Sequence, residues 1–94
     1  METRFIVVIS MKTLRGYMIT GQFFVGNDPK YANDLFAQLE SVESKIQSPV
    51  LKMELQAEKA GDRQVLQQLS CTLQQLTANT RYIVRETFKL FNLE

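Results

Sequence analysis

The 94-residue chain has no histidine, one cysteine, two prolines and four glycines. Without histidine, histidine-dependent catalytic triads and histidine-based metal sites are excluded. A single cysteine cannot form an internal disulfide, which fits a reducing compartment. The sequence therefore predicts no catalytic residues, no metal site and no cofactor. We expect a cytoplasmic protein that is not an enzyme.

Long apolar runs and a strong charge of one sign are also missing. The apolar run from Phe5 to Ile9 is far too short to cross a membrane. A net charge of +1 gives no strong attraction to nucleic acid or to anionic lipid. The segment Gly26 to Pro29 lacks the glycine spacing and the lysine of a phosphate-binding loop. An apolar content of 45% is typical of a globular fold, and we expect a single domain over residues 1–94.

Apolar and polar residues alternate through residues 1–26, which predicts a β-hairpin with its turn at Thr13 to Gly16. If odd residues pair with odd residues, one face of the hairpin is almost wholly apolar, with Phe5, Val7, Ile9, Met11, Tyr17, Ile19 and Phe23. The other face mixes polar residues with four apolar ones, Ile6, Val8, Met18 and Phe24. These four form a candidate partner surface, although scattered apolar residues are also normal on an exposed sheet.

A first helix is predicted over residues 28–47. Asp28 can cap its free backbone N–H groups, and Pro29 suits the first helical position. Pro49 ends this helix, because the residue before a proline is pushed out of helical geometry. Alternation then predicts a third, half-buried strand over residues 50–58, with charged residues on its outer face.

The segment from Asp62 to Leu93 contains no glycine or proline, and its apolar positions project onto one stripe about 60° to either side of Leu69. This pattern predicts one long helix over residues 62–92, roughly 45 Å long if unbroken. The weak helix formers from Thr77 to Thr80 leave a break possible, but the shared stripe favours continuity. On this helix Cys71 projects away from the stripe and is expected to be exposed.

The predicted order is β-β-α-β-α. We expect an α+β, two-layer fold, with a three-stranded antiparallel sheet in the order 2-1-3, both helices on one face and a long C-terminal helix. No sheet that a chain of this length can build is 45 Å long, so part of the helix overhangs the core, breaks or meets another chain.

One group of charges on the long helix bears on function. Arg81, Arg85 and Lys89 recur at four-residue spacing, with Tyr82 beside them. Cations interleaved with an aromatic ring can bind phosphate backbones or stack on bases, which makes these four residues a possible patch for an anionic partner. The alternative is that cations near a helix C-terminus offset the helix dipole and keep this face soluble.

The sequence favours a non-enzymatic module that acts through self-association or as a protein–protein interaction adaptor. We expect a homodimer that uses the outer sheet face, the overhanging part of the long helix, or both. One alternative is a nucleic-acid-associated protein that uses the basic patch, although three cations are few for tight binding. Another is a small-ligand-binding subunit of a larger assembly, with a pocket lined by Tyr17, Phe23, Phe36 or Tyr31. No membrane partner is expected.

Overall fold

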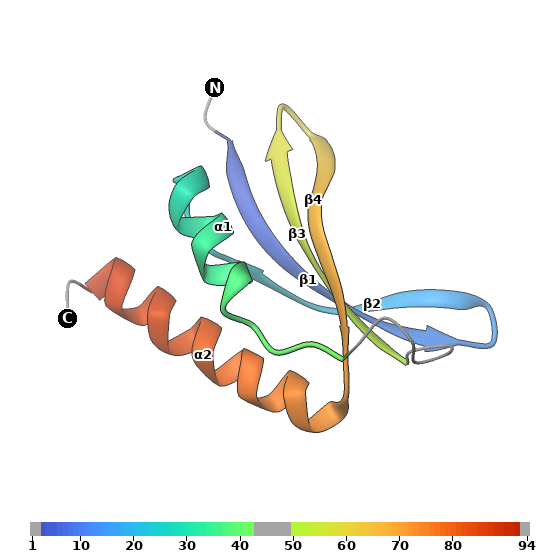
Figure 1. Ribbon diagram of the computed structural model, residues 1–94. Coiled ribbons are helices and arrows are strands. Elements are labelled where there is room, and N and C mark those ends of the chain that lie inside the picture. The colour runs from blue at the N-terminus through green and yellow to red at the C-terminus, as the bar shows by residue number, and fades with distance from the viewer. Residues whose placement is uncertain (1–2, 43–49, 93–94) are drawn as a thin grey trace.

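The computed structural model describes residues 3–42 and 50–92. The elements follow the order β1 (Arg4–Thr13), β2 (Gly16–Phe24), α1 (Pro29–Ala37), β3 (Leu51–Lys59), β4 (Asp62–Cys71) and α2 (Leu73–Asn92). The four strands form one antiparallel sheet in the order β2-β1-β3-β4, and the two helices pack against it (Figure 1). The predicted α+β class and the long C-terminal helix are confirmed. The order of elements is ββαββα rather than ββαβα.

The prediction of a helix over residues 62–92 is wrong for residues 62–71, which form β4. Ala60 and Gly61 make the turn that starts this strand, with φ angles of 54° and 85°. Two consecutive residues at positive φ are typical of the tight turn that joins antiparallel strands. Leu55 pairs with Gln67 and Gln56 pairs with Val65, so Leu66 is an extra residue in β4. This bulge breaks the strand's alternation, and for this reason the segment resembles a helical stripe.

The helix α2 begins after a capping box. The Thr72 side-chain oxygen accepts a hydrogen bond from the Gln75 backbone N–H at 3.1 Å, and the Gln75 side-chain oxygen accepts one from the Thr72 N–H at 3.0 Å. This reciprocal pair satisfies two backbone donors at the helix start. The helix then continues through Thr77 to Thr80, so the predicted continuity of this stretch is confirmed. Its 20 residues span about 30 Å.

The helix α1 begins as predicted but ends earlier. Asp28 is its N-cap and accepts a hydrogen bond from the Lys30 N–H at 3.0 Å, with Pro29 in the first turn. The helix ends at Ala37, whereas the prediction extended it to residue 47; residues 43–47 of that prediction lie outside the described residues. Beyond the helix, the Glu40 backbone N–H donates a hydrogen bond to the side-chain oxygen of the buried Asn79 of α2 at 2.7 Å. The Asn79 side-chain nitrogen donates a second one to the Glu40 carbonyl at 2.9 Å. These bonds to α2 take the place of further helical bonds at Glu40.

The core lies between one face of the sheet and both helices. It is formed by Phe5, Val7 and Ile9 of β1, Leu51, Met53 and Leu55 of β3, Ala32, Leu35 and Phe36 of α1, and Ile83 of α2, with Val25, Leu39 and Cys71. The expected exposure of Cys71 is therefore wrong. As a residue of β4 opposite Leu51, Cys71 lies on the inner face of the sheet. Burial raises the pKa of its thiol.

The hairpin register agrees with the prediction over its first half. Val7 pairs with Phe23 and Ile9 pairs with Gly21, and both Val7 and Ile9 are buried. The register then shifts, because Ser10 pairs with Ile19 and leaves Thr20 as an extra residue of β2. Beyond this bulge, odd residues of β2 pair with even residues of β1. Tyr17 and Ile19 therefore lie on the outer face and are exposed, contrary to their predicted place on the inner face.

Candidate interaction surface

Over Ile6 and Val8, the outer face of the sheet is covered by its own polar side chains. Ile6 and Val8 lie on this face, yet they are only 4% and 0% exposed. Their neighbours on β2 and β3 include Gln22, opposite Val8, and Gln56, opposite Ile6. Arg63 of β4 reaches across the sheet and donates hydrogen bonds to the side-chain oxygens of both glutamines, at 3.0 and 3.3 Å. These long side chains account for the burial of Ile6 and Val8 within a single chain.

Phe24 and Met18, the other two residues of the predicted partner surface, do not lie beneath these polar side chains. The Phe24 ring stacks on Phe91 of α2, with ring centroids 5.9 Å apart. The guanidinium group of Arg4 lies 5.2 Å from the centre of the Phe24 ring. Met18 is exposed and pairs with Met11 in the distal half of the hairpin. The structure thus does not bring Ile6, Val8, Met18 and Phe24 together as one open apolar surface.

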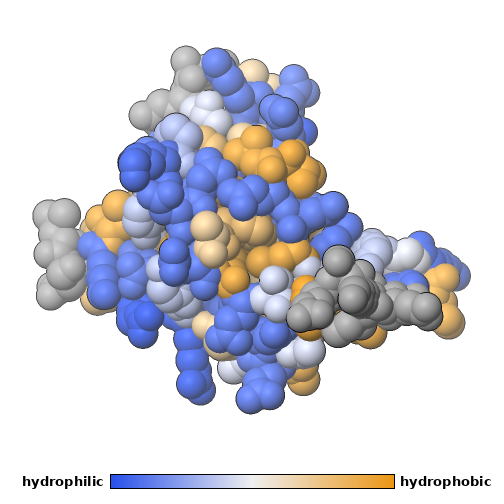
Figure 2. Space-filling view, in the orientation of Figure 1, coloured by the Kyte–Doolittle hydropathy of each residue, from blue (hydrophilic) through white to orange (hydrophobic). Residues whose placement is uncertain are grey.

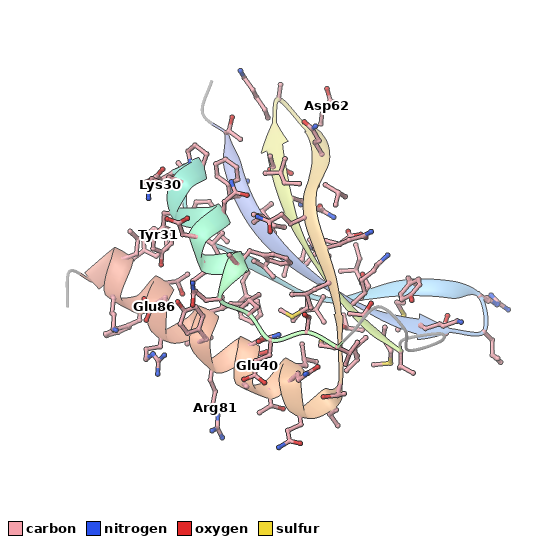
Figure 3. All side chains as sticks on the ribbon, viewed as in Figure 1. Lys30, Tyr31, Glu40, Asp62, Arg81 and Glu86 are labelled. Atoms are coloured by element: carbon pink, nitrogen blue, oxygen red, sulfur yellow. The ribbon has the colours of Figure 1, made fainter. Side chains whose placement is uncertain are left out.

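The four residues of the predicted basic patch lie on α2. Tyr82 packs partly against the core, and the Arg85 guanidinium lies 5.5 Å from the centre of its ring. Glu86 lies within 3.5 Å of Arg85 and 3.2 Å of Lys89, whereas Arg81 points away from the sheet (Figure 3). Glu86 offsets part of the charge of these two cations, which weakens the attraction for a phosphate backbone. Nucleic-acid binding by this patch stays a prediction.

The helix α2 has a second, partly apolar face that the fold leaves mostly exposed, although Phe91 at its end stacks on Phe24 of β2. Its inner side carries the buried Asn79 and Ile83. A second side of α2 lies roughly a third of a turn around the helix axis from this inner side. It carries six positions at alternating spacings of four and three residues: Leu73, Thr77, Thr80, Val84, Thr87 and Phe91. Leu73, Val84 and Phe91 are 71%, 50% and 55% exposed. Figure 2 shows apolar surface beside the C-terminal end of α2 and further apolar patches over the middle of the molecule.

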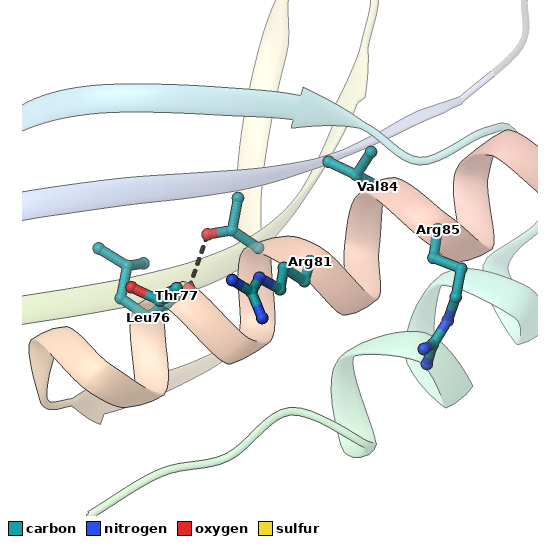
Figure 4. Close-up of a pocket in the computed structure, with 6 residues that line it drawn as sticks. Leu76, Thr77, Arg81, Val84 and Arg85 are labelled. Carbon is teal, nitrogen blue, oxygen red and sulfur yellow. Dashed lines mark hydrogen bonds between the residues drawn. The ribbon is translucent and has the colours of Figure 1, made fainter.

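A shallow groove of about 510 Å³ lies along this exposed face (Figure 4). It is lined by Leu76, Thr77, Thr80, Arg81, Val84 and Arg85. Four of these residues, Thr77, Thr80, Arg81 and Val84, have the relative positions i, i+3, i+4 and i+7. When two helices pack closely along such a repeat, each inserted side chain of one helix fits between four residues of the other, at these relative positions. The groove therefore has the form of a helix-packing site.

The stripe predicted from the sequence includes Leu73, Thr80, Val84, Thr87 and Phe91 as core positions and leaves out Thr77. A stripe that extends about 60° to either side of one line merges two faces of α2, one buried and one exposed. A repeat of 3.5 residues from Leu73 to Phe91 was the available signal, since such a repeat is typical of helices that pair along a narrow seam.

A smaller cavity of about 310 Å³ lies between α1 and α2. It is lined by Tyr31, Asp34, Leu35, Gln38, Tyr82 and Glu86. The Tyr31 hydroxyl is buried and has no hydrogen-bond partner among the described residues. Burial, and secondarily the negative charge of Glu86, raise the pKa of Tyr31. The expected ligand pocket is not assembled from its four predicted residues, because Phe36 is in the core and Tyr17 is exposed on the hairpin.

Comparisons with known proteins give no assignment of family or function. No protein-family model matches the chain, and neither a curated protein nor a solved structure shows significant similarity to it. Among residues 3–42 and 50–92, no three cysteine or acidic side chains are grouped so that they could hold a metal ion. Neither described helix has the length and apolar character needed to span a membrane.

Proposed function

We propose that this protein is a non-enzymatic, self-associating module in which the exposed face of α2 binds the same face of a second copy. The observation that carries this proposal is the 3.5-residue repeat on that face, from Leu73 to Phe91, together with the groove at its centre. Such a repeat brings a straight seam of side chains against a neighbouring helix. The core of the chain itself does not use this seam, because it packs against another side of α2.

A second copy is the partner that such a surface fits most directly. In a two-fold dimer each chain presents the same patch, so the patch must complement itself. The exposed face of α2 offers small residues, Thr77 and Thr80, in the groove, and a large residue, Phe91, towards one end. Its six positions are apolar or threonine, so the face can pack against its own copy without burying a charge.

The size of this face sets the expected strength of the dimer. A seam about 30 Å long, with threonine at three of its six positions, is at the low end of stable protein interfaces. Weak interfaces of this size dissociate on dilution. We therefore expect the dimer fraction to rise with concentration across the micromolar range.

Sedimentation velocity over a range of concentrations tests the proposal. The variant Val84→Glu places a charge at the centre of the seam and should shift the protein to monomer, because a carboxylate is costly to bury without a partner. Val65→Glu is the matched control, since Val65 is 49% exposed on β4, close to the 50% of Val84. It should dimerise like the unmodified protein. A monomer mass for the unmodified protein at several hundred micromolar would contradict the proposal.

A further inference from the structure

We propose that the two α2 helices run parallel in this dimer, so that each seam position faces its own counterpart. This inference rests on the proposed function, because it concerns the arrangement of the second copy on the same face of α2. It follows from the seam positions and from the charges beside them.

The seam is the set of six residues at alternating spacings of four and three from Leu73 to Phe91. These residues occupy two alternating positions of a seven-residue repeat. Thr77, Val84 and Phe91 occupy one of these positions, and Leu73, Thr80 and Thr87 occupy the other. In a parallel pair each of these six residues meets the same residue of the second copy. Val84 then meets Val84 at the centre of the seam, whereas the Phe91 ring at its end also stacks on Phe24 of its own chain.

The charges beside the seam favour this arrangement over an antiparallel one. In an antiparallel pair that overlaps fully from Leu73 to Phe91, Thr77 of one helix lies opposite Thr87 of the other. Arg81, one position beyond Thr80, then lies against Arg81 of the second copy. Like charges brought together at an interface oppose association. The only acid of α2, Glu86, lies on the opposite side of the helix from the seam and within 3.2 Å of Lys89.

A parallel pair keeps the arginines apart. Arg81 flanks one side of the seam and Leu76 flanks the other. When the helices are parallel, each flank of one helix faces the unlike flank of the other. Arg81 therefore lies beside Leu76 of the second copy, where its aliphatic stem packs on an apolar side chain and its guanidinium group stays in water.

Disulfide cross-linking distinguishes the two orientations. The variants Thr77→Cys and Thr87→Cys make the same conservative change at two seam positions that are about 15 Å apart along the helix. Two cysteines form a disulfide only if their Cα atoms are within about 7 Å. A parallel pair predicts that each variant, oxidised alone, forms a disulfide-linked dimer. A mixture of the two variants should then give no link between positions 77 and 87, as judged by peptide mass spectrometry.

Two controls isolate the seam. The native Cys71 is buried, so the unmodified protein should stay unlinked. Thr20→Cys places a thiol at an exposed position of β2 and should also stay unlinked. Sedimentation velocity of each reduced variant reports whether it still forms a dimer before oxidation.

The outcomes separate this inference from the proposed function. Links only between positions 77 and 87 in the mixture would overturn the parallel arrangement, while self-association through α2 would stand. A dimer that none of these cysteines cross-links would show that another surface is used, and would overturn both. A monomer at every concentration would refute the proposed function directly.

Discussion

Replacing Asn79 with alanine removes the side chain that holds the chain after α1 against α2. The Asn79 side-chain oxygen accepts a hydrogen bond from the Glu40 N–H at 2.7 Å, and its nitrogen donates to the Glu40 carbonyl at 2.9 Å. Asn79 itself is only 2% exposed. A hydrogen bond contributes about 1 kcal/mol net, and a partly buried group left without its partner adds to the loss. We therefore expect Asn79→Ala to lower the free energy of unfolding by about 2–3 kcal/mol.

Urea denaturation followed by far-ultraviolet circular dichroism measures this loss. In thermal unfolding the same change corresponds to a fall in Tm of about 10–20 °C for a domain of this size. Gln74→Ala, at an exposed position of the same helix, is the control and should change stability by less than about 0.5 kcal/mol. Asn79→Asp keeps the acceptor but loses the donor, and should be at least as destabilising as Asn79→Ala. If Asn79→Ala and Gln74→Ala had equal effects, the bonds to Glu40 would not hold the segment in place.

Three further predictions concern the core, the start of α2 and the buried thiol. Ile9→Ala should cost about 2–4 kcal/mol in urea denaturation, whereas Thr20→Ala, at the exposed bulge, should cost well under 1 kcal/mol; equal losses would refute the register of β1 and β2. Thr72→Ala should cost about 1 kcal/mol by removing half of the capping box, and a neutral result would mean that the box does not stabilise the helix. Because burial raises the pKa of Cys71 in the folded state, stability should fall as the pH rises from the ordinary thiol pKa through the raised value. Cys71→Ala should remove this fall in denaturation curves recorded at alkaline pH, and an unchanged pH profile would show that the thiol is accessible in the fold.

Signals that lie close together in the sequence predicted most of the elements correctly. Asp28 and Pro29 marked the start of α1, and alternation located β1, β2 and β3. Thr77 to Thr80 stayed helical, because small losses in helix propensity are outweighed by the packing of a shared face. For the start of α1 and for these three strands, the signal that decides the local structure lies within a few residues.

The errors came from features whose cause is distant or irregular. The bulge at Leu66 gave β4 the pattern of a helical stripe, although Ala60 and Gly61 between two alternating segments were a usable turn signal. Beyond the early end of α1, the Glu40 backbone binds Asn79, 39 positions further along the chain, and no local pattern predicts this contact. The threonine and glutamine at positions 72 and 75, by contrast, were a visible capping box.

The candidate site was predicted less well for the same reasons. The burial of Ile6 and Val8 depends on Arg63, which the sequence reasoning placed in a helix rather than on a strand of the same sheet. The exposure of Val84 depends on which side of α2 the core uses, and that is decided by the arrangement of the sheet. The heptad spacing was present in the sequence, but only the fold separates an exposed repeat from a buried one.

The position of β1 at the centre of the sheet has a consequence for synthesis on the ribosome. Proteins emerge from their N-terminus, so β1 and β2 can form their hairpin before the rest of the chain is made. The other edge of β1 then stays open until Leu51–Lys59 has been translated, because β3 is the strand that pairs with it. An open edge with apolar residues invites pairing with other chains. Changes that delay the docking of β3 are therefore expected to reduce the yield of soluble protein more than their effect on the final stability implies.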